Sequence, residues 1–134
     1  MSATYVLDTY ALVAYLRNEP AGPHVAELLT RAKERELRLL VCLINLGEVV
    51  YSTERRGGLR AAQDAIALMD DLPLDVAPVD RELTLAAAHI KANHRLSYAD
   101  AFAVALARQE GATLVTGDPE LKALKHLVPL EYLA

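Results

Sequence analysis

Apolar residues along the chain follow two alternating patterns. Short runs in which every residue is apolar, such as residues 39–44 (LLVCLI), are typical of strands covered on both faces. Between such runs, apolar residues recur every three or four positions, as Val25, Leu28 and Leu29 do, which is the spacing of one helix face. This alternation continues through the chain and predicts an α/β domain with a mainly parallel sheet.

Glycine, proline and polar residues mark the ends of the expected elements. Strands are predicted over residues 4–8, 39–44, 76–79, 113–117 and 127–133. Helices are predicted around residues 9–18, 25–32, 46–53, 62–69, 83–90, 97–110 and 119–124. The helix over 97–110 should be buried, because residues 101–107 are apolar nearly all round, and Gly111 should cap it.

Two further expectations concern the edges of this arrangement. Pro129 favours an edge position for the last strand, because proline lacks a backbone donor. The helices on either side of Gly57 and Gly58 should form a hairpin. That hairpin has more apolar residues than a thin layer of an α/β domain needs, so part of it is expected to face a second subunit in a homodimer.

The composition excludes several kinds of protein. With 134 residues, 53% of them hydrophobic, residues 1–134 are expected to form one compact domain. Cys42 is the one cysteine, which excludes an internal disulfide and a cysteine zinc site, and we expect it to be an inert core residue. No apolar run could span a bilayer, and no basic segment precedes the first apolar stretch, so we expect a cytoplasmic protein without membrane association.

Four acidic residues fall at the ends of predicted strands or the beginnings of helices. In a parallel sheet with right-handed crossovers, these ends share one edge of the domain, where ligands bind. We therefore expect four carboxylates to converge there, and a divalent cation is the simplest remedy for their repulsion. Oxygen ligands suit Mg²⁺ or Mn²⁺. A net charge of −4 does not argue against an enzyme of this kind, because a bound cation reverses the local field. The four residues are Asp8, Glu48, Asp100 and Asp118.

Each of these residues could instead be a helix cap, since acidic residues favour helix N-termini. The capping alternatives are Asp8 before Thr9, the pairs Asn45/Glu48 and Ser97/Asp100, and Asp118 before Pro119. Asp80 also follows a strand and opens a helix. Its strand should lie at the far side of the sheet, so we interpret Asp80 as a cap and not as part of the site.

Four short motifs carry a resemblance to a known family. They are residues 6–12 (VLDTYAL), 45–48 (NLGE), 96–101 (LSYADA) and 114–118 (LVTGD). In this order and spacing they resemble the motifs of PIN-domain proteins across nearly the whole chain. The resemblance is closest to VapC-type toxins of prokaryotic toxin–antitoxin pairs. One departure is Leu121, where a phenylalanine is common, and it should alter packing and not metal binding.

The resemblance implies a three-layer α/β/α sandwich with a parallel five-stranded sheet of order 3-2-1-4-5. It also implies a homodimeric ribonuclease that uses Mg²⁺ or Mn²⁺ and is inhibited by a small antitoxin. Asp8 and Asp100 would be the principal metal ligands, and Asp118 would ligate directly or through water. Glu48 would be an outer ligand or would orient the attacking water.

Three polar residues beside the acidic ones are expected to support them. Thr9 and Thr116 could orient the aspartates, or could form local turn bonds. Asn45 could hold Glu48 or touch the substrate, although we favour its role as a helix N-cap. Ser97 is expected to be a cap. Arg17 and the basic residues near the hairpin turn could bind RNA, although arginines at such positions are more often ordinary solvated side chains.

Other chemistries have less support. A haloacid-dehalogenase-like phosphatase needs a second aspartate two residues after Asp8, and Tyr10 occupies that position. The four histidines lack a zinc spacing, and no glycine-rich phosphate loop is present. A non-catalytic PIN-like module that binds RNA or protein stays open as an alternative, because acidic caps can persist without activity.

Overall fold

A computed structural model describes residues 3–133 and contains one sheet of five parallel strands. The strands lie in the order β3-β2-β1-β4-β5. Their bounds are β1 (Ala3–Leu7), β2 (Leu37–Cys42), β3 (Asp75–Ala77), β4 (Thr113–Thr116) and β5 (Leu130–Tyr132). The predicted α/β class and strand order are confirmed.

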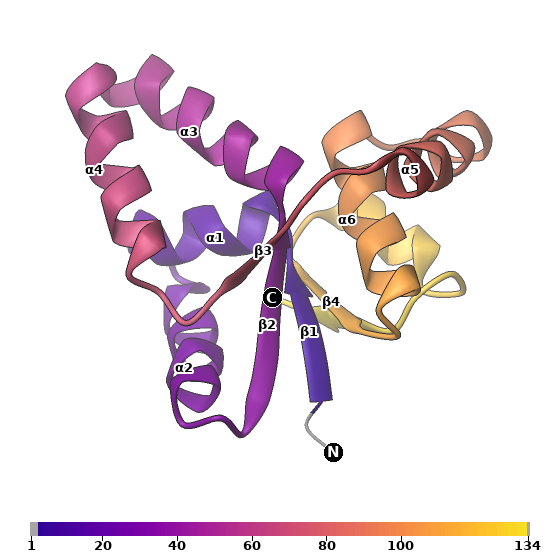
Figure 1. Cartoon of the computed structure of the whole chain (residues 1–134), viewed down its shortest axis with the longest axis horizontal. Helices are drawn as coiled ribbons and strands as arrows, with labels where there is room; N and C mark the ends of the chain where they lie inside the picture. Colours follow the sequence, from indigo (N-terminus) through magenta and orange to yellow (C-terminus); the bar gives the residue numbers. More distant parts are fainter. Residues whose placement is uncertain (1–2, 134) are drawn as a thin grey trace.

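Helices cover both faces of the sheet, as Figure 1 shows. One layer is formed by α1 (Thr9–Leu16), α2 (Gly22–Lys33), α3 (Leu43–Gly57) and α4 (Leu59–Asp70). The opposite layer is formed by α5 (Arg81–Asn93), α6 (Tyr98–Gln109) and the 3₁₀ helix η1 (Pro119–Leu124). The fold is therefore the expected three-layer α/β/α sandwich.

The sheet separates two hydrophobic cores because successive strand residues point to opposite faces. In β1, Val6 packs with the α5–α6 layer, whereas Leu7 packs with α1 and α2. In β2, Cys42 is fully buried in the same core as Val6, as predicted. Leu121 is also fully buried in this core, which fits its expected role in packing.

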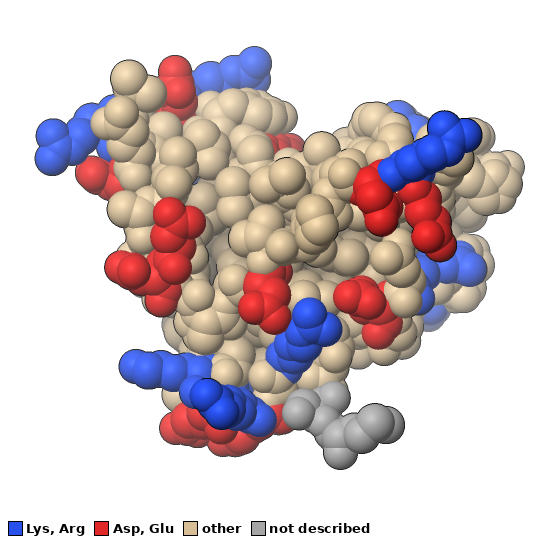
Figure 2. All heavy atoms as spheres, viewed as in Figure 1, with Lys and Arg blue, Asp and Glu red and all other residues tan. Residues whose placement is uncertain are grey.

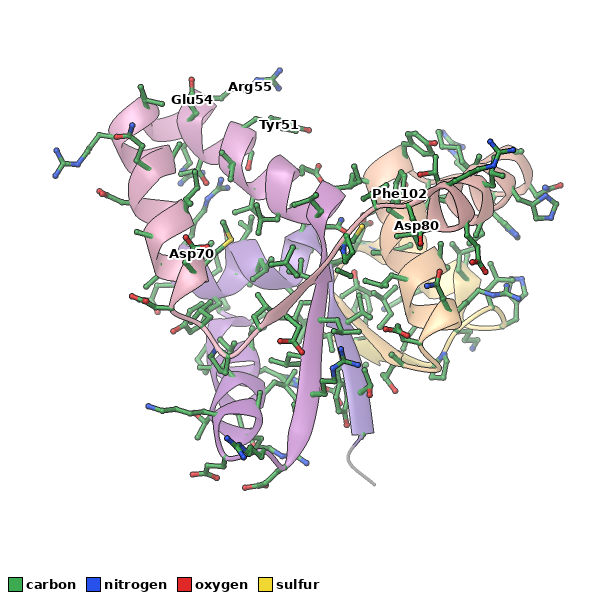
Figure 3. The ribbon with its side chains drawn as sticks, viewed as in Figure 1. Tyr51, Glu54, Arg55, Asp70, Asp80 and Phe102 are labelled. Carbon is green, nitrogen blue, oxygen red and sulfur yellow. The ribbon has the colours of Figure 1, made fainter. Side chains whose placement is uncertain are left out.

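The helix α6 is the most deeply buried helix of the fold. Every residue from 100 to 107 is buried, including Phe102, which Figure 3 labels on this helix. Gly111 follows the helix with a positive φ of 61°, a conformation that favours glycine. The amide of Ala112 bonds to the carbonyl of Ala107 at 2.8 Å, which closes a Schellman-type end. Both expectations for this helix are confirmed.

The boundary between β2 and α3 differs from the prediction. The strand ends at Cys42, and the last two residues of the apolar run, Leu43 and Ile44, form the first turn of α3. They are 47% and 36% exposed, so their apolar character does not reflect burial in the sheet. An uninterrupted apolar run has no periodicity that would mark where a strand gives way to a helix. The shift moves Asn45 from the expected helix boundary into the helix.

The two edge strands are shorter than predicted. The third strand covers Asp75–Ala77 and not residues 76–79, and an exposed ion pair of 3.2 Å joins Asp75 to Arg38 of β2. The last strand covers Leu130–Tyr132 at the opposite edge, directly after Pro129. Its edge position is as predicted, and it pairs in parallel with β4.

The helical hairpin of α3 and α4 projects beyond the sheet, as Figure 1 shows. Gly58, at a φ of 88°, joins the two helices, as predicted. Tyr51 and Arg55 lie on its outer part in Figure 3, with the guanidinium 5.0 Å from the ring centroid. In the view of Figure 2, a mostly uncharged surface lies between the charged side chains of the α3–α4 hairpin and the charged side chains of the α5–α6 layer. Among the described residues, no helix has the length and apolar character needed to cross a bilayer.

Candidate functional site

Asp8 lies where the central strand β1 passes into α1. It is the N-cap of that helix, and its Oδ1 accepts a 2.8 Å hydrogen bond from the amide of Ala11. The residue is 0% exposed, and its Oδ2 is buried without a hydrogen-bond partner among residues 3–133. A buried carboxyl oxygen without a partner is costly, so a cap alone does not account for this side chain.

Burial raises the pKa of Asp8 to about 7. The nearby Thr116 hydroxyl and the Ala11 amide act in the opposite direction, and the charges of Asp100 and Asp118 raise the pKa further. These effects show that Asp8, Asp100 and Asp118 are close enough for their charges to interact. The predicted convergence of strand and helix ends therefore brings these three carboxyl groups together.

Asp100 is held in the first turn of α6. The hydroxyl of Ser97 accepts the Asp100 amide at 3.1 Å, so Ser97 caps the helix as expected. Asp100 is only 9% exposed. Burial raises the pKa of Asp100 to about 7, with further increases from the charge and hydrogen bonding of Asp118 and from the charge of Glu48. The Ser97 hydroxyl lowers it.

Asp118 follows β4 and caps the short helix η1, where its Oδ1 accepts the amide of Glu120 at 2.9 Å. Its own amide donates to the hydroxyl of Thr116 at 3.0 Å. Thr116 is completely buried, and it forms the local turn bond that was one of the two roles predicted for it. The Thr116 hydroxyl also lowers the pKa of Asp8, so it interacts with two of the aspartates.

Glu48 of α3 is positioned by Thr9 of the neighbouring helix α1. The Thr9 hydroxyl donates to Oε1 of Glu48 at 2.7 Å and accepts from the Asn45 amide at 3.1 Å. The two roles predicted for Thr9 were to orient an aspartate or to form a local turn bond, and in the structure its hydroxyl instead donates to the glutamate. Glu48 lies in the second turn of α3, so it does not cap the helix.

Asn45 ties three helices together. Its Nδ2 donates to Thr9 of α1 and to the carbonyl of Ala99 in α6, at 3.1 and 3.2 Å. The favoured prediction, that Asn45 is an N-cap, is wrong: Cys42 holds that position, and Asn45 lies in the first turn of α3. Asn45 is completely buried, and its Oδ1 has no partner. The earlier start of α3 explains the difference, because it turns Asn45 inward.

A pocket of about 460 Å³ opens over this cluster. Glu48, Asp100 and Asp118 line it, and Asp8 lies buried beside them. The prediction missed Tyr10 and Val13, which line the pocket from α1 together with Arg17. Their spacing of three and four residues places all three on one helix face. This spacing could have been recognised in the sequence, given a helix that begins at Thr9. The remaining lining residues are Thr9, Ser52, Ser97 and Glu120.

Two other groups of polar residues lie apart from this pocket. Asp80 is the N-cap of α5, accepting the Leu83 amide at 2.8 Å, and it does not line the pocket. Its predicted role as a cap is confirmed, and Figure 3 labels it. A second pocket of about 460 Å³ lies between α5 and α6, and of the described residues that line it, Glu82 alone carries a carboxylate. It therefore lacks the paired acidic groups of the first pocket.

The donor set of the first pocket fits a hard divalent cation. All four candidate ligands are carboxylates, and one oxygen of Asp8 is buried without a partner. Within residues 3–133, however, no three histidine, cysteine, aspartate or glutamate side chains are arranged as a ready-made ion cage. The chain therefore supplies suitable oxygen donors, whose assignment as metal ligands stays a prediction.

Several solved structures have the same fold. One is VapBC2 from Rickettsia felis bound to promoter DNA, with a TM-score of 0.77, 19% identity, and coverage of 98% of this chain and 99% of that chain. Another is the toxin VapC20 from Mycobacterium tuberculosis, described as cleaving the sarcin–ricin loop, with a TM-score of 0.74, 22% identity, and coverage of 90% and 94%. DNA-bound VapBC from Salmonella typhimurium gives a TM-score of 0.77, 18% identity, and coverage of 98% and 99%.

The sequence itself gives the family. No curated protein matches it significantly. The family model for the PIN domain matches residues 5–127, a range that includes all four carboxylates. The order of the strands, the acidic pocket at their carboxyl ends and this match agree, and the chain belongs to the PIN-domain family.

Proposed function

We propose that this chain is a metal-dependent endoribonuclease that hydrolyses phosphodiester bonds of RNA with Mg²⁺ or Mn²⁺. The observation that carries the proposal is the set of carboxyl groups at one edge of the sheet. Asp8 and Asp100 are buried, and each has its pKa raised by burial and by neighbouring carboxylates. Membership of the PIN family and the likeness to an RNA-cleaving toxin support the same conclusion.

In this proposal Asp8 and Asp100 are the principal metal ligands, and Asp118 ligates directly or through water. A divalent cation held by these residues would make hydroxide accessible near neutral pH and would offset the charge of the phosphate. The Oδ2 of Asp8 is buried without a hydrogen-bond partner among the described residues, so in this proposal it is the oxygen that ligates the ion. The amide of Ala11 holds the other oxygen, Oδ1, by its hydrogen bond of 2.8 Å.

Glu48 has a different role, because Thr9 engages one of its two oxygens. The other oxygen remains to orient the attacking water. Water oxygen attacks phosphorus in line with the leaving oxygen. As the new P–O bond forms and the water releases a proton to solvent, the old P–O bond breaks and the leaving oxygen takes up a proton from solvent. The products are two RNA fragments, and no covalent enzyme intermediate forms.

We further propose that the chain is the toxin of a toxin–antitoxin pair, active as a homodimer and inhibited by a small antitoxin. Several structures with this fold are VapBC toxin–antitoxin complexes, which supports such a partner. The exposed apolar residues of the α3–α4 hairpin offer a surface for either contact. They include Tyr51, Leu59, Ile66 and Leu68.

The decisive experiment compares wild type with Asp100→Asn and Asp80→Asn on single-stranded RNA in Mg²⁺ or Mn²⁺, with an EDTA control. Asp80→Asn is the matched control, because Asp80 also caps a helix but lies outside the pocket. We expect metal-dependent cleavage by wild type and Asp80→Asn, and a large loss with Asp100→Asn.

Calorimetric titration with Mn²⁺ gives a second readout that does not depend on finding a cleavable RNA. Wild type and Asp80→Asn should bind the ion, and Asp100→Asn should bind it more weakly. A wild type that neither cleaves RNA nor binds Mn²⁺ through Asp100 would overturn the proposal. The carboxylates would then be helix caps of a non-catalytic module.

A further inference from the structure

One face of α1 forms a wall of the acidic pocket. Tyr10, Val13 and Arg17 all line it, at the spacing of residues on one helix face. From Tyr10 to Arg17 the helix rises about 10 Å, at roughly 1.5 Å per residue. The wall thus presents an aromatic ring, an aliphatic side chain and a cation in a row beside the carboxylates.

The ring of Tyr10 packs closely against Gly117. A Cβ atom at Gly117 would collide with three atoms of this ring, so the side chain rests directly on the glycine backbone. Gly117 is buried and precedes Asp118, whereas Tyr10 is 44% exposed. One side of the ring is therefore supported and the remainder is open to the pocket.

Arg17 supplies the positive charge that the pocket otherwise lacks. Of the residues that line it, all within the described range, Arg17 is the only lysine or arginine. One guanidinium nitrogen donates to the hydroxyl of Ser52 at 3.3 Å, and that hydroxyl donates to the carbonyl of Val49. This anchors the side chain and leaves further N–H donors for an anion.

We propose that Tyr10 is a stacking platform for a nucleobase of single-stranded RNA and that Arg17 holds a phosphate of the same strand. The inference rests on the proposed ribonuclease function and names how its substrate is held. A flat apolar surface and a cation, about 10 Å apart along one wall of the pocket, match a base and a phosphate of one strand. A base is free to stack on a protein ring only where it is not stacked in a duplex, which selects single-stranded RNA.

Binding of fluorescein-labelled oligo-uridylate, measured by anisotropy in Mg²⁺, tests the platform. The parent protein carries Asp100→Asn, so that the probe is not cleaved. Adding Tyr10→Ala should weaken binding about tenfold, the size of one lost base stack. Tyr10→Phe and Tyr10→Trp should bind like the parent, because stacking needs the ring and not the hydroxyl. Equal binding by Tyr10→Ala, or a loss with Tyr10→Phe as large as with Tyr10→Ala, would overturn the proposal.

An abasic form of the same probe separates stacking from a general effect on the fold. The parent should lose affinity for the abasic strand, whereas Tyr10→Ala should bind both strands equally. Arg17→Ala should weaken both strands and reduce the dependence of binding on salt, since it removes a phosphate contact. If the parent binds both strands equally, the platform is refuted. Metal-dependent cleavage by wild type then decides separately whether the proposed ribonuclease function survives.

Discussion

Thr9 donates a hydrogen bond of 2.7 Å to Glu48, which lies 39 residues farther along the chain. Because Thr9 directly follows Asp8, this bond connects the backbone around one carboxylate to the side chain of another. The same hydroxyl accepts from Asn45, whose amide also reaches the first turn of α6. The acidic side chains are therefore held relative to one another by a directional set of hydrogen bonds, and not by packing alone.

Replacing Thr9 tests this connection. Thr9→Val keeps the shape of the side chain but removes the donor, so Glu48 should lose its fixed position. We expect RNA cleavage to fall about 10- to 100-fold, the range for residues that orient metal-site ligands. The loss should appear in kcat more than in KM, because the bond orients a reacting group and not the RNA. Thr9→Ser should restore most of the activity, and a Thr9→Val enzyme with unchanged kcat would contradict the role.

Replacing Asn45 should lower the stability of the fold more than replacing Thr9 does. Asn45→Ala leaves the carbonyl of Ala99 and the hydroxyl of Thr9 without their donor in a buried region. The free energy of unfolding, measured with urea, should fall by about 1–3 kcal/mol. Asn45→Asp should be worse, because it places a carboxylate against a carbonyl oxygen. A stability equal to wild type in both variants would show that the network does not hold the helices.

The raised pKa of Asp8 predicts how stability depends on pH. Unfolded aspartate ionises near pH 3.8, whereas Asp8 in the folded protein keeps its proton up to about 7. Its contribution to stability is therefore fully present below pH 3.8 and is lost as the pH rises towards 7. The loss in metal-free protein is at most about 4 kcal/mol.

Asp8→Asn isolates this contribution, since asparagine also caps helices well. In EDTA, the variant should gain stability relative to wild type as the pH rises from 4 to about 7. At pH 7, Mn²⁺ should raise the Tm of wild type and of Asp80→Asn but not of Asp8→Asn. If the difference in unfolding free energy between Asp8→Asn and wild type does not change with pH, then the pKa of Asp8 is not raised.

Gly117 gives a test of local packing. Gly117→Ala places a methyl group where the Tyr10 ring lies, which should cost about 1–3 kcal/mol of unfolding free energy. In a Tyr10→Ala background the same substitution should cost much less, because the obstructing ring is gone. A cost that is equal in both backgrounds would mean that the glycine is required for another reason.

The sequence was sufficient to predict the acidic pocket because its residues lie at predictable places. Asp8, Asp100 and Asp118 each end a strand or begin a helix, and parallel topology brings such positions to one edge. The same reasoning excluded Asp80 from the acidic site, and its predicted role as a helix cap is confirmed.

Interactions across the domain were harder to predict. The partner of Thr9 depends on how closely α1 approaches α3, which no local pattern encodes. Asn45 was misplaced because residues 43 and 44 are apolar and lack a visible helix signal. The support of Tyr10 by Gly117 brings together residues from β1–α1 and β4–η1, which only the folded sheet makes neighbours.

The parallel pairing of β1 with β4 also governs when the site can exist. Leu7 pairs with Val115, so β1 waits for a partner strand that is synthesised much later in the chain. Asp8 has Asp118 as a neighbour only after that pairing forms. A growing chain that has not yet exposed β4 thus has three of the four carboxylates but no complete cluster. Under the proposed function, a nascent chain is harmless to the RNA around it, and nuclease activity begins only with the finished fold.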